Sequence, residues 1–200
     1  MKGTGAIIYV ICDWLVRLAL LNILWIGFSL LGAGILGFFP ASVAGAALLN
    51  EWLSGQRPAP LSFYWNMYKR TFTAANAIFI PALLIFVVLL LNTYASLRFD
   101  GVWFYVFVSS TLFLSGGAAF ILLLSLLPLS QGEKAITAVK RALHLLMYYP
   151  GRVVMMVIGM VFLGLCIRLV PGILPLYSIN IVLGLVIYLF SFYKNSPKPA

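Results

Sequence analysis

Long uncharged runs dominate the hydropathy pattern of this chain. Five of them contain no Asp, Glu, Lys or Arg: 18–50, 71–97, 101–132, 153–167 and 169–193. A helix needs about 20 consecutive apolar residues to cross roughly 30 Å of hydrocarbon. The pattern therefore predicts about five membrane-spanning helices.

Proline and glycine positions set the ends of these spans, because proline removes a backbone donor and clashes with the preceding helical turn. Pro40 interrupts the first run, so we expect a span over 18–39 and a separate short helix over 41–53 along the membrane surface. The other spans are expected over 74–91, 103–127, 153–170 and 176–193. The predicted fold class is all-α: a polytopic transmembrane helical bundle that forms a single membrane-embedded domain over 1–200.

Two connecting segments have the period of amphipathic interfacial helices. The first, 61–73, places Leu61, Tyr64, Trp65, Tyr68 and Phe72 on one face. Aromatic rings favour the headgroup level of a membrane. We therefore expect this face to lie at the interface, ahead of the second span.

The second amphipathic segment is 130–149. Ser130 and Glu133 have the spacing of a capping box. An apolar stripe opposes a polar face with Lys134, Arg141 and His144; the stripe consists of Ile136, Val139, Leu143 and Leu146. On an anionic inner leaflet, the stripe is expected in the acyl boundary and Arg141 at the phosphates.

Composition narrows the class further. The chain is 64% hydrophobic and 8% charged, with a mean hydropathy of +1.09, whereas soluble domains are about half apolar and about a quarter charged. The net charge of +9 reflects 13 Lys and Arg against 4 Asp and Glu. No dense basic run or stacking platform accompanies it, so no nucleic-acid partner is expected.

The distribution of Lys and Arg predicts the orientation. In the five-span arrangement, nine of the 13 cations lie on one side and four on the other. Because cytoplasmic connections carry the excess of Lys and Arg, the N-terminus is expected outside and the C-terminus in the cytoplasm of a bacterial cytoplasmic membrane.

A few polar residues near the first span are candidates for contacts. Asp13 and Arg17 have i,i+4 spacing, and we interpret them as a self-neutralising pair near the outer interface, with a substrate or partner contact as the alternative. Asn22 and Ser29 share a helix face with Trp25 nearby, which favours hydrogen bonding to a neighbouring helix over a binding site.

The sequence contains few residues that could carry out catalysis. His144 is the only histidine, and the four carboxylates are scattered singly. No HExxH, GxSxG, GxGxxG or phosphate-loop pattern occurs. We therefore expect no catalytic residues, no cofactor and no metal, and we rank an intramembrane enzyme last among the functions.

A resemblance to a known family comes from two blocks. The first contains Asp13-Trp14, Arg17-Leu18, Asn22, Leu24-Trp25, Ser29, Gly32, Gly37 and Pro40-Ala41, and the second contains Phe63, Trp65, Tyr68, Lys69 and Phe72. Together they resemble the YesL-like family of bacterial membrane proteins, which has no established activity. The resemblance implies a multi-span protein of the cytoplasmic membrane, associated with carbohydrate-uptake gene clusters, and it implies no catalytic residues.

The sequence is compatible with two candidate functions. The first is a non-enzymatic accessory or scaffold protein, with the lipid bilayer and other membrane proteins such as sugar-transport components as partners. Its candidate structural or partner-contact residues are Asp13, Arg17, Asn22, Trp25, Pro40, Trp65 and Tyr68. The alternative is a small transporter or permease subunit, because glycine and proline break the spans. No clear internal repeat supports that alternative.

Overall fold

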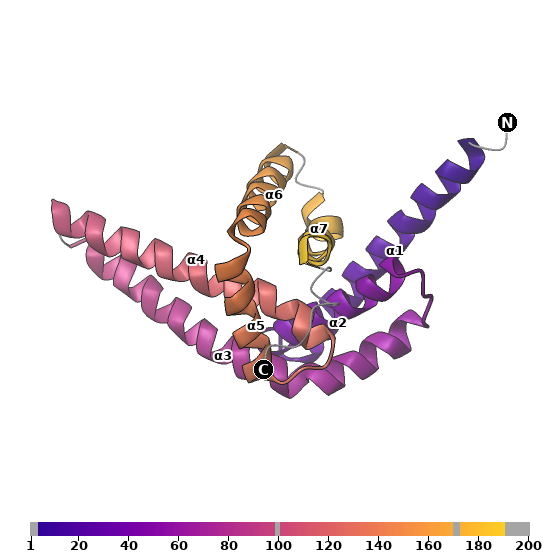
Figure 1. Cartoon of the computed structure of the whole chain (residues 1–200), viewed down its shortest axis with the longest axis horizontal. Helices are drawn as coiled ribbons and strands as arrows, with labels where there is room; N and C mark the ends of the chain where they lie inside the picture. The colour runs from indigo at the N-terminus through magenta and orange to yellow at the C-terminus, as the bar shows by residue number, and fades with distance from the viewer. Residues whose placement is uncertain (1–3, 99–100, 170–172, 191–200) are drawn as a thin grey trace.

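The computed structural model describes residues 4–98, 101–169 and 173–190, and within them it contains helices and no strand (Figure 1). The seven helices are α1 (Thr4–Leu31), α2 (Ile35–Leu53), α3 (Pro60–Ser96), α4 (Val102–Ser130), α5 (Ala135–Tyr148), α6 (Pro150–Leu169) and α7 (Ile173–Phe190). The all-α fold class is confirmed.

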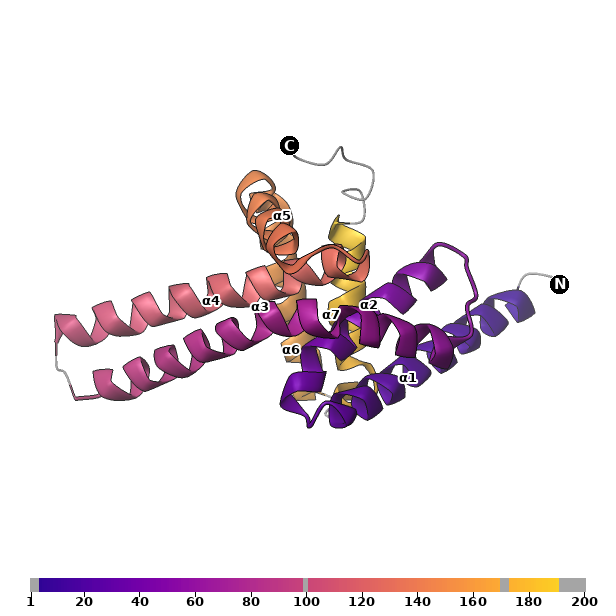
Figure 2. The same ribbon diagram turned by 90° about the horizontal axis from the view of Figure 1, so that it is seen from below.

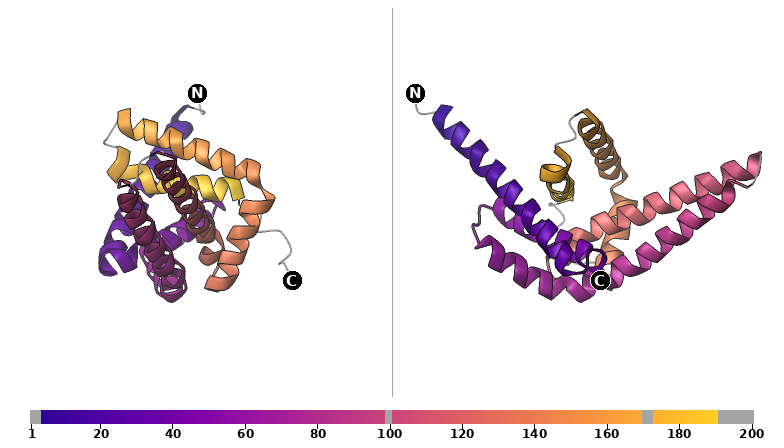
Figure 3. Two further views of the ribbon diagram at one scale, coloured as in Figure 1. Left: turned by 90° about the vertical axis from the view of Figure 1, so that its left-hand side faces the viewer. Right: turned by 180° about the vertical axis from the view of Figure 1, so that it is seen from behind.

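The helices fan out from a common base. In Figure 1, α1 rises on one side and the α3–α4 hairpin on the other, with α6 and α7 between them. The base contains α2, the first turns of α3, the end of α4 and α5. Figures 2 and 3 show that α1 and the hairpin project in opposite directions. The arms therefore pack against the rest of the chain mainly near the base.

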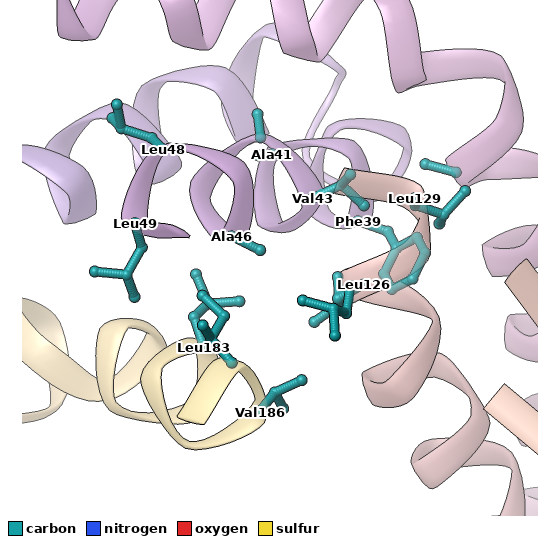
Figure 4. Close-up of a cluster of buried hydrophobic side chains, with 14 of the residues drawn as sticks. Phe39, Ala41, Val43, Ala46, Leu48, Leu49, Leu126, Leu129, Leu183 and Val186 are labelled. Carbon is teal, nitrogen blue, oxygen red and sulfur yellow. The ribbon is translucent and has the colours of Figure 1, made fainter. Parts of the chain in front are cut away.

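The centre of the base is α2, which the sequence placed on the membrane surface. That prediction is wrong: every residue from Phe39 to Leu49 is buried. Figure 4 shows Leu49 and Ala46 facing Leu183 and Val186 of α7 and, from the same helix, Phe39 close to Leu126 of α4. A helix that is apolar all round is a buried helix. Its many alanines and its two glycines let the neighbouring helices approach from several sides.

The α1–α2 corner lies at Ala33 and Gly34 and not at Pro40. Helix α1 ends at Leu31 and α2 begins at Ile35, so the span predicted over 18–39 is wrong at both ends. Ala33 and Gly34 take positive φ angles of 57° and 76°, which reverses the chain direction. Pro40 sits inside α2, where it leaves the carbonyl of Leu36 without its helical donor.

Helix α3 joins two elements that the sequence separated. The interfacial segment 61–73 and the span 74–91 form one helix of 37 residues, about 55 Å long, and Pro81 does not break it. The hydrocarbon core is roughly 30 Å thick, so α3 extends well beyond one crossing. Tyr64 and Tyr68 are buried, and the aromatic face packs on Phe28 of α1, with ring centroids 4.8 Å and 5.2 Å apart. The pattern had indicated that this face lies at the headgroups, but packing against α1 prevents the whole face from doing so.

Helix α5 confirms an amphipathic helix within 130–149, but its start and the position of Arg141 differ from the prediction. Ser130 ends α4, where its Oγ donates to the carbonyl of Leu127, and the N-cap Lys134 has no side-chain cap, so the capping box is wrong. Arg141 is buried and pairs with Glu133, whereas Leu143 is 39% exposed. A carboxylate from the preceding loop compensates the charge of Arg141, which lets the residue face the interior and not the phosphates.

The last helices turn sharply. Helices α5 and α6 meet at an angle of 96°, and α6 and α7 replace the spans predicted over 153–170 and 176–193. Residues 170 and 191–193 lie outside the described residues. Arg152 at the start of α6 donates from Nη1 to the carbonyl of Leu189 at 2.7 Å. A cation at a helix C-terminus satisfies an orphan carbonyl and the helix dipole, so this contact fixes the end of α7.

Helix lengths and apolar content support several crossings. In the described residues, four helices are long and apolar enough to cross a membrane. They are α2, α3, α4 and the part of α1 over 6–31, and the bent α5–α6 pair would make a fifth crossing. Helix α4 replaces the span predicted over 103–127. Large apolar side chains are exposed along α1, α3, α4 and α6. Such continuous apolar surface is stable in hydrocarbon and not in water.

The first prediction tests the corner. A Cβ added to Gly37 would lie 2.3 Å from the carbonyl oxygen of Ser29, so Gly37→Ala must push α1 and α2 apart. Overpacking of this kind costs about 1–3 kcal/mol or more. We expect a lower melting temperature in detergent and less folded protein in the membrane. Gly27→Ala is the matched control, because nothing lies within 4 Å of its added Cβ. Equal behaviour of the two variants would contradict the packing described for this corner.

Candidate functional site

Several of the polar residues selected from the sequence lie on α1. Asp13 follows the start of α1 at Thr4 by about 13 Å, so it lies within the apolar helix. The sequence had placed Asp13 and Arg17 ahead of the first span, near the outer interface; the candidate span of the structure, 6–31, includes both. An ionisable residue inside a span is costly to keep there and is by default a functional candidate.

Asp13 and Arg17 form an ion pair on one face of α1. Arg17 Nη2 lies 2.7 Å from Asp13 Oδ2, and the side chains are 15% and 31% exposed, respectively. The guanidinium of Arg17 also lies 5.5 Å from the ring centroid of Trp14 and 5.9 Å from that of Trp52 on α2. The pair is therefore neutral as a unit, tied to α2 by a cation–π contact, and open to the surroundings on its Asp13 side.

A buried amide contact joins α1 to α7. Asn180 Nδ2 donates to the carbonyl of Leu18 at 2.7 Å, and both Asn22 and Asn180 are buried. Sequence reasoning selected Asn22 but missed Asn180. An amide within the last uncharged run was the available signal, since polar groups in spans usually hydrogen-bond to a neighbouring helix.

A groove opens beside Asn180. It has a volume of about 550 Å³ and lies between α1, the end of α2 and α7; its lining includes Trp14, Leu18, Asn50, Ser54, Asn180 and Tyr188. We call it the α1–α7 groove. Its walls are mostly aliphatic, with amide, hydroxyl and indole groups at intervals. This is the chemistry of a site for another helix or for an amphipathic molecule.

Trp25 ties α1 to α2 on another face. Its Nε1 donates to Ser42 Oγ at 3.0 Å, and Ser42 Oγ donates in turn to the carbonyl of Phe38 at 2.9 Å. The Trp25 and Phe38 rings meet edge to face, with centroids 5.3 Å apart. Sequence reasoning did not select Ser42, whose role depends on how α2 folds back on α1. Trp25 thus acts as a structural clamp.

Trp65 and Tyr68 belong to a second group, in the base. Their rings stack at 6.4 Å, and Lys69 Nζ lies 4.9 Å from the Trp65 centroid. The buried Tyr64 donates its hydroxyl to the carbonyl of Ala41, one residue after Pro40, at 2.6 Å. The structure therefore divides the sequence candidates. Asp13, Arg17 and Asn22 lie on α1, although none of them lines the α1–α7 groove. Trp65 and Tyr68 instead hold α3 against the corner.

Catalytic groups are sparse around both groups of residues. Across the part of the chain that the structure describes, no three His, Cys, Asp or Glu side chains come close enough to hold a metal ion. The polar residues on α1 and around the α1–α7 groove provide one ion pair and several hydrogen-bonding groups in an apolar setting. Such a set can position a helix or a small molecule.

The exposed apolar surfaces, the long helices and the polar groups placed within them define an integral membrane protein with several helical spans. Comparison with known proteins refines this class. Residues 18–93, which cover the second half of α1, all of α2 and most of α3, match a family described as "Protein of unknown function, DUF624".

Three proteins of Bacillus subtilis (strain 168) are similar to the chain, and all three are described as uncharacterized. YesV is 29% identical over 92% of this chain and 89% of its own length. YteU is 41% identical over 32% of this chain, and YesL 39% over 32%. The aligned segment spans only 30% of YteU and 32% of YesL. These similarities confirm the resemblance to the YesL-like proteins that the sequence predicted. No solved structure matches it.

The second prediction tests the Asp13–Arg17 pair. Asp13→Asn or Arg17→Gln alone leaves one charge uncompensated inside an apolar helix, whereas the double change removes both. Removing one partner of a fully buried ion pair lowers the free energy of unfolding by roughly 3–5 kcal/mol. Because Asp13 is partly exposed, each single change should lower it by less than that. The double change should cost less than either single change. Folded protein in the membrane, measured as a double-mutant cycle, reports the difference.

The opposite pattern would identify a functional site. If each single variant folds normally but loses the biological phenotype, and the double variant does not restore it, the pair contacts a substrate or partner and its structural role is minor. The conservative variant Asp13→Glu serves as the control, because it keeps the charge on the same face of α1.

Proposed function

We propose that the protein is a non-enzymatic accessory or scaffold subunit that binds another polytopic protein of the bacterial cytoplasmic membrane. The observation that carries this proposal is the projecting arm of α1. Residues 7–11 are each more than half exposed, and the arm continues directly into the Asp13–Arg17 pair. A lipid surface gives the partly exposed carboxylate of Asp13 no hydrogen-bond donor, whereas a partner helix can.

A second surface supports the same proposal. On α4, Ser109 and Ser110 are exposed, and nothing in the chain lies within 4 Å of a Cβ added to Gly116 or Gly117. Small residues at a helix surface let another helix approach closely. The chain thus presents two arms that its own helices leave uncovered.

The proposed partner is a component of a sugar-uptake system. This part of the proposal rests on the resemblance to the YesL-like family alone. The sparse ionisable inventory of the described residues fits a binding role better than proton transfer. The activity of the whole protein follows from that partner and not from a catalytic centre in this chain.

A small transporter or permease subunit is the second candidate, and the α1–α7 groove favours it. The groove volume of about 550 Å³ is within the range of small-molecule sites, and Asn50, Ser54 and Asn180 supply polar contacts. The neighbouring α1–α2 pair is broken at glycine, as are the discontinuous helices that bind substrates in transporters.

We also propose that the base of the molecule faces the cytoplasm. The segments that carry Lys69, Arg70, Lys134, Lys140 and Arg141 meet at the base, whereas Arg98 follows α3 at the hairpin tip and Arg168 lies near the far end of α6 (Figure 1). An excess of Lys and Arg marks the cytoplasmic side. We take α1, α3, α4, α6 and α7 as the spans, because α2 is buried in the base and the shorter α7 returns the chain from the far end of α6. In this arrangement the N-terminus is outside and the C-terminus inside.

The third prediction tests this orientation. A reporter that is active only in the cytoplasm should be active when fused after residue 200 and inactive when fused before residue 1. A third fusion in the α4–α5 loop at Gly132 should also be active, because that loop belongs to the base. Activity at both termini would mean an even number of crossings and would contradict the arrangement.

The fourth prediction tests the accessory role. A photo-crosslinking residue at Val10 on the α1 arm should yield a reproducible adduct with one membrane protein in intact cells. The same residue at Ile158, which is similarly exposed on α6, should yield only lipid adducts and serves as the control. Asp13→Asn should weaken the Val10 adduct. If Val10 gives no protein adduct while the purified chain alone moves a sugar across liposomes, the accessory proposal fails and the transporter replaces it.

A further inference from the structure

A second groove lies on the other side of the base, between α3, α4 and α5. Its volume is about 390 Å³, and its lining includes Ala77, Pro81 and Ile85 of α3, Ile121 of α4, and Val139 and Lys140 of α5. We call it the α3–α5 groove. Its wall is almost wholly aliphatic, and Lys140 is the single charged residue that lines it. An apolar groove on a surface that already faces lipid fits an alkyl chain.

Cations surround the α5 end of this groove. Lys140 lies on its edge, and Lys134 stands at the start of α5, about 9 Å earlier along the helix axis. Across the loop, the guanidinium of Arg70 from α3 lies directly against Gly132. All three cations are exposed. Two helices and one loop therefore bring three positive charges to the same end of an apolar groove.

These charges are not neutralised by the chain itself. The α4–α5 loop carries one carboxylate, Glu133, and that carboxylate pairs with the buried Arg141. In the described parts of the chain, the recorded ion pairs are this one and Asp13–Arg17, so Arg70, Lys134 and Lys140 have no acidic partner there. The first turn of α5 also has no acidic residue, and its free N–H groups add to the positive potential.

The apolar surroundings fix the level of the site. Ile136, on the first turn of α5, is 74% exposed, and Ile85 at the other end of the groove is half exposed. Apolar side chains open to the surroundings belong in hydrocarbon, while exposed Lys and Arg belong at the headgroups. The groove therefore runs from the acyl region towards the phosphate level.

We propose that the α3–α5 groove is a binding site for one anionic phospholipid, with an acyl chain along the groove and the phosphate at Lys134, Lys140 and Arg70. The charge arrangement selects an anionic headgroup over a zwitterionic one. The aliphatic wall selects a lipid over free phosphate. The site needs no partner protein and is separate from the α1 arm and the α1–α7 groove.

Native mass spectrometry of the full chain, released from bilayers of equal phosphatidylglycerol and phosphatidylcholine, tests the site. We expect one phosphatidylglycerol to stay bound preferentially. The double variant Lys134→Gln, Lys140→Gln should lower that preference about thirtyfold, because each cation near an anionic surface strengthens binding about fivefold. Lys140→Arg should keep it. Arg98→Gln at the hairpin tip is the matched control and should change nothing. Melting temperatures confirm that each variant is folded.

The other outcomes overturn the proposal. Equal retention of the two lipids, or an unchanged preference in the double variant, would mean that no such site exists. An equal loss in Arg98→Gln would mean unspecific surface attraction. Displacement of the lipid by inorganic phosphate would indicate a phosphate site.

The variant Ala118→Phe tests the groove directly. A phenyl ring at position 118 fills the groove at its α4 wall and should release the lipid while the cations remain.

Discussion

The close approach of two backbones at the α1–α2 corner is the constraint on which the rest of the structure depends. Only glycine at positions 32 and 37 lets α2 return directly beneath α1, because a Cβ at either position would overlap the opposite backbone. The return places α2 in the middle of the base, where α1, α3, α4 and α7 all pack on it. The Trp25–Ser42 contact, the buried tyrosines of α3 and the α1–α7 groove all require that placement.

The buried helix also explains why the polar groups are where they are. Helices in a membrane gain little from hiding apolar surface, since lipid is equally apolar, so close packing and hydrogen bonds decide which helices meet. In this chain, small residues on α2 supply the packing, and Tyr64, Trp25 and Asn180 each direct a donor to an oxygen on another helix. The region that matches the DUF624 family, 18–93, contains the corner, α2 and the part of α3 that packs on them.

Sequence reasoning could predict the class of this fold because hydropathy and charge are properties of single segments. It found α4 and α6 nearly at their true bounds, and it found the pairing of Asp13 with Arg17 from their spacing. It failed where the outcome depends on contacts between segments. Pro40 is tolerated inside α2, Arg141 turns inward because Glu133 comes from the adjacent loop, and Asn180 meets α1 across 162 positions of sequence. None of these follows from local pattern alone.

Helix α3 has a mechanical consequence. Its first turns are clamped in the aromatic base by Phe28, and its last turn carries the hairpin tip, with no break between them. An unbroken helix is stiff along its length, so a small rotation at the clamped end becomes a larger sideways displacement at the far end. The hairpin thus has the geometry of a lever that pivots where α3 packs on the buried α2.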